Sequence, residues 1–90
     1  MDRTIKKLGS LKPGAKGRIV AIGSDTPVQD PEAAMISERL REIGFMEDMA
    51  IEVTAESPFG RDPVSVRIDH MLIALRRREA ESVLVEIERE

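Results

Sequence analysis

His70 is the one histidine of this sequence, and no cysteine is present. It follows Asp69 in a predicted turn, where its imidazole is the candidate ligand for Fe²⁺ or another divalent transition metal. A zinc or iron site needs about three or four protein ligands, commonly His, Cys or carboxylate. Asp62 or Glu56 would approach His70 only through the fold. The number of ligands required therefore favours an ordinary surface histidine and no resident metal.

The remaining polar residues lack the spacing of a catalytic or cofactor site. Glu79 with Glu81, and Glu86 with Glu88, are carboxylate pairs without a general acid–base signature, which also needs a cleft or a partner group. The sequence contains no G-x-x-x-x-G-K-[ST] phosphate loop, nucleophile elbow or H-E-x-x-H helix. We therefore expect neither an enzyme nor a bound cofactor.

Three residues are candidates for contact with a partner protein: Met46, Phe59 and Arg76. Met46 follows a helix end, and it is either exposed beside Phe45 as an adaptable contact patch or buried with it under the helix. Phe59 lies at the tip of a loop rich in proline and glycine, where an aromatic ring more often folds back onto the domain. Arg76 begins a run of three arginines. Such a run either meets an acidic partner or lipid phosphates, or forms a solvated connection.

Composition narrows the class of protein. Ninety residues make one domain with a small core. The 14 basic and 17 acidic residues give a net charge of −3, which argues against nucleic acid as the main partner. No apolar run is long enough for a signal peptide or a membrane span, so we expect a cytoplasmic protein without direct membrane insertion. Nothing in the sequence determines the oligomeric state.

The element that organises the chain is a helix that ends on a glycine and leads into a strand. Ile36, Leu40 and Ile43 share one helical stripe. Gly44 stands where a left-handed residue is needed at the helix end, and Phe45 can fold back onto Leu40. We place the helix over residues 31–43.

Strands are predicted on both sides of this helix, which begins after the N-cap residue Asp30. Alternating or β-branched segments place them over residues 17–22, 49–56, 64–68, 71–75 and 83–87. The segment 71–75 is almost entirely apolar, so we expect both of its faces to be covered. The pattern predicts a mainly β fold, a small bent barrel of about five strands with one inserted helix. Residues 1–7 are expected to form a flexible lead-in, and residues 8–90 a single domain.

Several segments in this order resemble the FeoA family, small cytoplasmic proteins of bacterial ferrous-iron uptake. They are Leu8-Gly-Ser-Leu-Lys-Pro-Gly14, Gly17-Arg-Ile-Val-Ala-Ile22, Arg39-Leu-Arg-Glu-Ile-Gly-Phe45, Ser57-Pro-Phe-Gly-Arg-Asp-Pro63 and Ile73-Ala-Leu-Arg-Arg-Arg-Glu-Ala80. The resemblance spans residues 8–87 and implies an SH3-like β-barrel with a helix inserted after the first strand. The sequence departs from the family at Met46-Glu47-Asp48, where a Pro-Gly turn is common, and in a longer loop over residues 23–30.

The resemblance also implies an accessory function. FeoA-like proteins act with FeoB, a membrane ferrous-iron transporter with a cytoplasmic GTP-hydrolysing domain, which would recruit the chain to the inner face of the membrane. The alternative is a transition-metal-binding regulatory module, because related SH3-like domains form the C-terminal part of DtxR-type repressors. A third hypothesis is a structural module that associates with itself through a sheet edge or the helix face.

Overall fold

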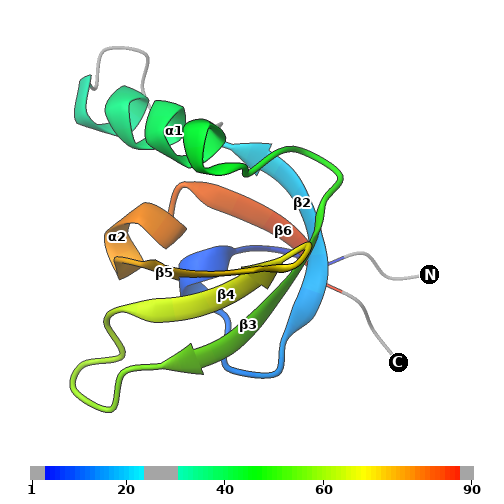
Figure 1. Cartoon of the computed structure of the whole chain (residues 1–90), viewed down its shortest axis with the longest axis vertical. Helices are drawn as coiled ribbons and strands as arrows, with labels where there is room; N and C mark the ends of the chain where they lie inside the picture. The colour runs from blue at the N-terminus through cyan, green and yellow to red at the C-terminus, as the bar shows by residue number, and fades with distance from the viewer. Residues whose placement is uncertain (1–3, 24–30, 88–90) are drawn as a thin grey trace.

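Six antiparallel strands form one strongly curved sheet in the computed structural model of the chain, which describes residues 4–23 and 31–87 (Figure 1). The strand order across the sheet is β1-β6-β2-β3-β4-β5. The strands are β1 (Thr4–Lys7), β2 (Lys16–Ile22), β3 (Ala50–Glu56), β4 (Val64–Ile68), β5 (Met71–Leu75) and β6 (Val83–Ile87). The helices are η1 (Leu8–Ser10), α1 (Pro31–Ile43) and α2 (Arg77–Ala80), and α1 lies over one end of the sheet (Figure 1). The predicted mainly β fold with one inserted helix is confirmed.

β1 is a strand that the sequence analysis did not predict. Thr4–Lys7 pairs with β6 in a register that runs from Thr4 opposite Ile87 to Lys7 opposite Leu84. The predicted flexible lead-in over residues 1–7 is therefore wrong for residues 4–7, and residues 1–3 lie outside the described residues. The reason is that β1 pairs with the edge of β6 that β2 leaves unpaired. The local sequence of β1, which contains two lysines, is only a weak strand pattern.

The end of α1 has the predicted geometry. Gly44 has φ 130°, and its N–H donates to the carbonyl of Arg41 at 3.2 Å. The Phe45 N–H donates to the carbonyl of Leu40 at 3.0 Å, which completes a Schellman motif, and the Phe45 ring is fully buried. The predicted N-cap, Asp30, lies outside the described residues.

β5 is less covered than its apolar sequence predicted. It is an edge strand that, among the described residues, pairs with β4 alone, and Leu72 is 66% exposed. Leu75 is buried, whereas Met71 and Ala74 are exposed. The prediction that both faces are covered is wrong, because a continuous apolar run does not specify whether a second layer exists on the outer face.

One core lies inside the curve of the sheet. In β2, Gly17 pairs with Ile51 of β3 on one side and with Ile87 of β6 on the other. A Cβ atom at Gly17 would lie 2.3 Å from the carbonyl oxygen of Glu86, so only glycine allows the two strands to approach this closely. The largest fully buried side chains come from most elements of the fold: Leu8, Ile19, Leu40, Phe45, Val53, Val64, Val66, Ile68, Leu75, Val83 and Val85.

Candidate functional site

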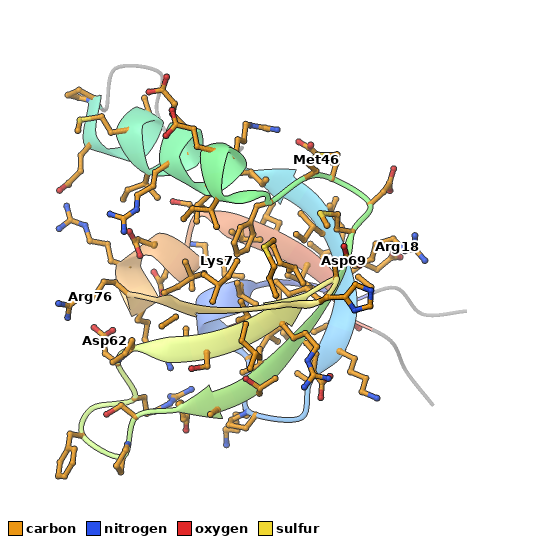
Figure 2. The ribbon with its side chains drawn as sticks, in the orientation of Figure 1. Lys7, Arg18, Met46, Asp62, Asp69 and Arg76 are labelled. Atoms are coloured by element: carbon orange, nitrogen blue, oxygen red, sulfur yellow. The ribbon has the colours of Figure 1, made fainter. Side chains whose placement is uncertain are left out.

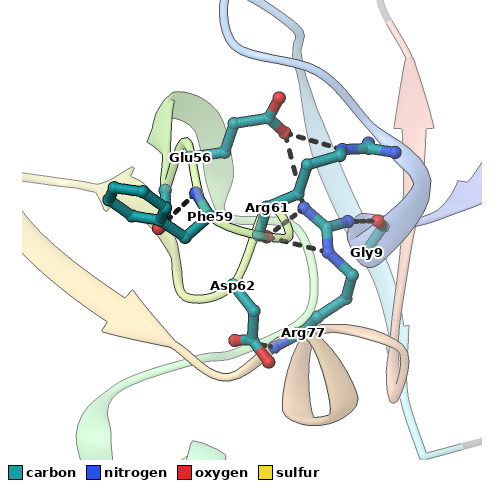
Figure 3. Close-up of polar contacts among 7 residues, drawn as sticks. Gly9, Glu56, Phe59, Arg61, Asp62 and Arg77 are labelled. Carbon is teal, nitrogen blue, oxygen red and sulfur yellow. Dashed lines mark hydrogen bonds and ion pairs between the residues drawn. The ribbon is translucent and has the colours of Figure 1, made fainter.

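The loop between β3 and β4, residues 57–63, is held in place by Arg77 of α2 (Figure 3). The Arg77 side chain donates from Nε and Nη2 to the carbonyl oxygen of Arg61, at 2.9 and 2.6 Å. Its Nη1 donates to the carbonyl oxygen of Gly9 in η1, and its backbone N–H donates to Oδ1 of Asp62 at 3.0 Å. One arginine therefore connects α2, η1 and this loop.

Further hydrogen bonds stabilise the same loop from within. Glu56 Oε1 lies 3.1 Å from Nε of Arg61 and 3.4 Å from Nη2 of Arg77. The Phe59 N–H donates to Oγ of Ser57 at 3.1 Å. Polar groups thus anchor the loop, and Phe59 is 86% exposed. The prediction that Phe59 folds back onto the domain is wrong.

Arg76 lies at a groove between α1 and α2. The groove has a volume of about 400 Å³ and is lined by Glu32, Met35, Ile36, Arg39, Arg76, Arg78 and Glu79. Glu79 accepts the backbone N–H of Arg76 at 3.0 Å and lies 3.5 Å from Nη1 of Arg39. The guanidinium of Arg76 has no ion pair with any of the described residues, and the Met35 side chain on the opposite wall is 68% exposed. The groove thus offers an unneutralised cation beside an apolar side chain.

Met46 lies beyond the C-terminal end of α1, and its side chain is 57% exposed although the adjacent Phe45 is buried. Exposure, the first alternative for this pair, therefore applies to Met46, and burial, the second, applies to Phe45. The following residue, Glu47, forms a two-pronged ion pair with Arg41, with N···O distances of 2.9 and 3.2 Å. The hydrogen bonds from Arg41, and then one from the Glu47 backbone, hold the pKa of the Glu47 carboxyl below its usual range. The hydrogen bonds to Glu47 and its negative charge raise the pKa of Arg41.

The structure brings only part of the predicted contact surface together. Figure 2 shows Arg76 and Asp62 on one side of the molecule and Met46 on the other. Phe59 belongs to the same loop as Asp62, and the Arg77–Asp62 hydrogen bond ties this loop to the helix that follows Arg76. Phe59 and Arg76 therefore share a side of the molecule, and Met46 lies apart from them.

His70 is in the predicted turn between β4 and β5, with its side chain 97% exposed. Its nearest acidic group is Asp69, whose Oδ1 lies 3.8 Å from Nε2 of His70. Among residues 4–23 and 31–87, no group of three or more His, Cys, Asp or Glu side chains is arranged to hold a metal ion. Glu56 and Asp62 face Arg77 instead, so the described residues do not provide the ligand set of a closed metal site.

Two features of this site were not predicted from the sequence. Arg77 has no local signal, because two of its partners, Gly9 and Glu56, are 68 and 21 residues away along the chain. The exposure of Met35 had a signal, since it lies outside the stripe formed by Ile36, Leu40 and Ile43. All four residues are apolar, but their positions along the helix place Met35 on a different face from the other three.

The FeoA-domain family model matches residues 6–87 of the sequence. The chain belongs to the FeoA family. No curated protein matches the sequence at a significant level. Membership links this FeoA protein to ferrous iron transport and agrees with the resemblance found in its sequence segments. Within the described residues, no helix is long and apolar enough to cross a membrane.

Solved structures confirm the SH3-like fold. The Stenotrophomonas maltophilia FeoA, described as a prokaryotic SH3-domain protein in complex with zinc, is 29% identical with a TM-score of 0.71. The alignment covers 89% of this chain and 88% of that protein. A FeoA-like protein from Clostridium acetobutylicum is 21% identical, with a TM-score of 0.79, over 100% of this chain and 93% of that one.

A manganese-dependent transcriptional repressor contains the same fold as part of a longer chain. It is 22% identical to this FeoA protein, with a TM-score of 0.77, over 98% of this chain and 44% of the repressor. This likeness supports the predicted relation between FeoA and the SH3-like domains of metal-dependent repressors. At this identity, it shows the fold alone.

Proposed function

We propose that this FeoA protein is an accessory protein that docks on the cytoplasmic GTP-hydrolysing domain of a FeoB-type transporter and alters ferrous-iron uptake by contact. The observation that carries the proposal is the exposed, structurally held Phe59 on a domain of the FeoA family. A domain without its own chemistry changes a transporter only if it binds one state of that transporter more tightly than another. This differential contact is the proposed mechanism.

The side of the molecule that carries Phe59 and Arg76 is the proposed docking surface. Arg77 and Glu56 hold the β3–β4 loop before any partner binds, so less conformational freedom is lost when Phe59 enters a partner pocket. In protein interfaces a few well-packed central side chains, often aromatic residues or arginine, carry most of the binding energy. Phe59 is proposed as such an anchor, with Arg76 as a polar contact beside it. Met46, on the other side, is proposed as a second and weaker contact.

Calorimetric titration with the isolated GTP-hydrolysing domain tests this proposal. We expect Phe59→Asp to weaken binding by about tenfold or more, as for a buried interface anchor, and Met46→Asp to weaken it less. Ile5→Asp, which changes an exposed apolar residue on β1, is the matched control and should leave affinity unchanged. If the Phe59 variant binds with wild-type affinity, the proposed docking surface is wrong. If the wild-type protein does not bind the domain, the proposed partner is wrong.

The zinc complex of the Stenotrophomonas FeoA supports a second proposal, that this chain binds a divalent transition metal with His70 as a ligand. Two side chains, His70 and Asp69, leave such a site incomplete, so the remaining ligands would come from water or another molecule. Anaerobic titration with Fe²⁺, followed by NMR at Asp69, His70 and Met71, tests it. Saturable shifts that disappear in His70→Ala would support it, and shifts only at millimolar metal would contradict it.

A further inference from the structure

Within residues 4–23 and 31–87, no strand pairs with the outer edge of β5. The turn Asp69–His70 makes Ile68 and Met71 the closing pair of the β4–β5 hairpin. Because hydrogen-bonded and non-hydrogen-bonded pairs alternate in an antiparallel ladder, Leu72 and Ala74 direct their N–H and C=O groups away from β4. Among the described residues, these groups have no backbone partner beyond the sheet.

This edge also lacks the protection that proteins usually give to an exposed strand. At the opposite edge of the sheet, β1 carries two exposed lysines, Lys6 and Lys7, which oppose pairing with another chain. β5 has the sequence Met-Leu-Ile-Ala-Leu, with no charge and no proline, and its Leu72 side chain is exposed. An unprotected apolar edge of this kind is a template for an added strand.

Arginines flank the edge, one on the outer face and one at its end. Arg67 is opposite Leu72 on β4, and its Nη1 lies 4.0 Å from Oε1 of Glu52, which is a weak neutralising contact. Arg76 follows the strand with its guanidinium unpaired among the described residues. A pocket of about 490 Å³, lined by Arg39, Pro63, Ala74, Arg76 and Glu79, opens beside the end of β5.

We propose that the free edge of β5 binds an extended, acidic segment of the partner as a seventh strand, with a carboxylate beside Arg76. This inference rests on the proposed function and names how the transporter's cytoplasmic domain would be held. Backbone groups of Leu72 and Ala74 supply the hydrogen bonds. Alternate side chains of the segment enter the pocket at Arg76 and a second hollow of about 400 Å³ beside Leu72 and Arg67 on the outer face.

The charges favour an acidic segment over a second copy of this chain. Two copies of β5 paired antiparallel about Ile73 would place Arg76 of one opposite His70 of the other. In such a dimer, His70 would not neutralise the charge of Arg76 in either copy. Asp or Glu on an added strand would neutralise the charges of both Arg67 and Arg76. The complementary partner is therefore an extended segment with carboxylates spaced along it.

Hydrogen exchange of the complete protein, with and without the GTP-hydrolysing domain, tests the proposal. We expect the amides of Leu72 and Ala74 to exchange at least about tenfold more slowly in the complex, because each gains a hydrogen-bond acceptor. Unchanged exchange at both amides, in a complex that calorimetry shows to form, overturns strand addition but not the proposed function. Absence of any complex overturns the proposed function and this inference with it.

Two variants give an independent test. Ala74→Pro removes an N–H that faces away from β4, a position that edge strands tolerate, and should weaken binding by about tenfold or more. Arg76→Glu should weaken binding by about tenfold through charge repulsion. Arg18→Glu, across the molecule from Arg76 (Figure 2), changes the net charge equally and should not.

Unchanged affinity in a folded Ala74→Pro variant overturns the proposal. If that variant does not fold, the exchange rates of the wild-type amides decide. Slow exchange at Leu72 and Ala74 that depends on protein concentration in the absence of the domain, with a dimer in sedimentation, would overturn the acidic segment in favour of a second copy.

Discussion

Arg77 shows how one side chain can decide what a loop presents. It has three acceptors outside α2, namely the carbonyls of Arg61 and Gly9 and the carboxylate of Glu56. Its side chain is only 20% exposed, so these groups interact in a partly dry environment. The neighbouring arginines differ, because Arg76 is unpaired among the described residues and Arg78 pairs at the surface with Glu32. Three identical adjacent residues thus have three different roles.

Removing the Arg77 guanidinium should destabilise the domain and release the loop. In Arg77→Met the carbonyls of Gly9 and Arg61 lose their donors, which costs about 1–3 kcal/mol of unfolding free energy. Chemical denaturation measures the loss, and faster hydrogen exchange at the Phe59 amide reports the loop. Arg78→Met, which removes a surface pair, is the control and should cost about 1 kcal/mol or less. Equal stability of the two variants would contradict the anchoring role.

The Arg41–Glu47 pair predicts a pH dependence. Because the Arg41 hydrogen bonds lower the pKa of Glu47 in the folded protein, the pair contributes stability above the unfolded pKa of about 4.3. That contribution is lost as pH falls through the lower folded pKa. NMR titration of the Glu47 carboxyl carbon should give a pKa below the usual range in wild type and a higher one in Arg41→Gln. Arg39→Gln should leave the titration of Glu47 unchanged. Identical titration curves in all three proteins would show that Arg41 does not lower the pKa of Glu47.

At the scale of elements, β2 sets the curvature of the sheet. It pairs with β6 along most of its length and with β3 at its start, and its register with β6 shifts between Ile19 and Ala21. Such a bulge, together with the close approach at Gly17, bends the strand so that one sheet can surround one core.

Gly17→Ala should therefore disrupt the β2–β6 crossing. The added Cβ would meet the Glu86 carbonyl oxygen at 2.3 Å and Cγ1 of Val85 at 2.6 Å, and backbone cannot yield as a flexible side chain can. We expect a loss of about 3 kcal/mol in denaturation, at the upper end for overpacking. Gly14→Ala, in a turn with open space around it, should cost about 1 kcal/mol from its φ of 98°. A smaller loss for Gly17→Ala than for Gly14→Ala would contradict this reading of the crossing.

At the scale of the whole molecule, helix and sheet share one core. Leu40 of α1 and Phe45 after it are fully buried against the same cluster as Val53, Val66 and Val85 of the sheet. No second cluster supports α1 separately in the described part of the chain. The helix is therefore stable only while the sheet is folded.

This shared core predicts a single cooperative unfolding transition. A domain of 90 residues with one core normally unfolds without a populated intermediate. Denaturation followed by far-UV circular dichroism and by fluorine NMR of labelled Phe45 should give coincident curves with equal midpoints and slopes. An earlier loss of the helical signal would show that α1 unfolds alone.

The sequence by itself determined the features that arise from short-range periodicity and backbone chemistry. These are the helix over residues 31–43, its end at Gly44, the turn at Asp69–His70 and the strands from β2 to β6, within a residue at each end. Their signals are local because a helical stripe, a glycine with positive φ and strand alternation each involve residues only a few positions apart. The segments that resemble the FeoA family are likewise short runs of consecutive residues.

Only the tertiary structure decided which neighbours each element pairs with or packs against. β1 pairs with the edge of β6, and no element among the described residues covers the outer face of β5. Phe59 is exposed on a loop that Arg77 holds. Each outcome depends on groups that are distant along the chain, as in the bond from Arg77 to Gly9 across 68 residues. Local pattern shows that a side chain is apolar or charged. Whether a partner lies against it is determined by the packing of the whole chain.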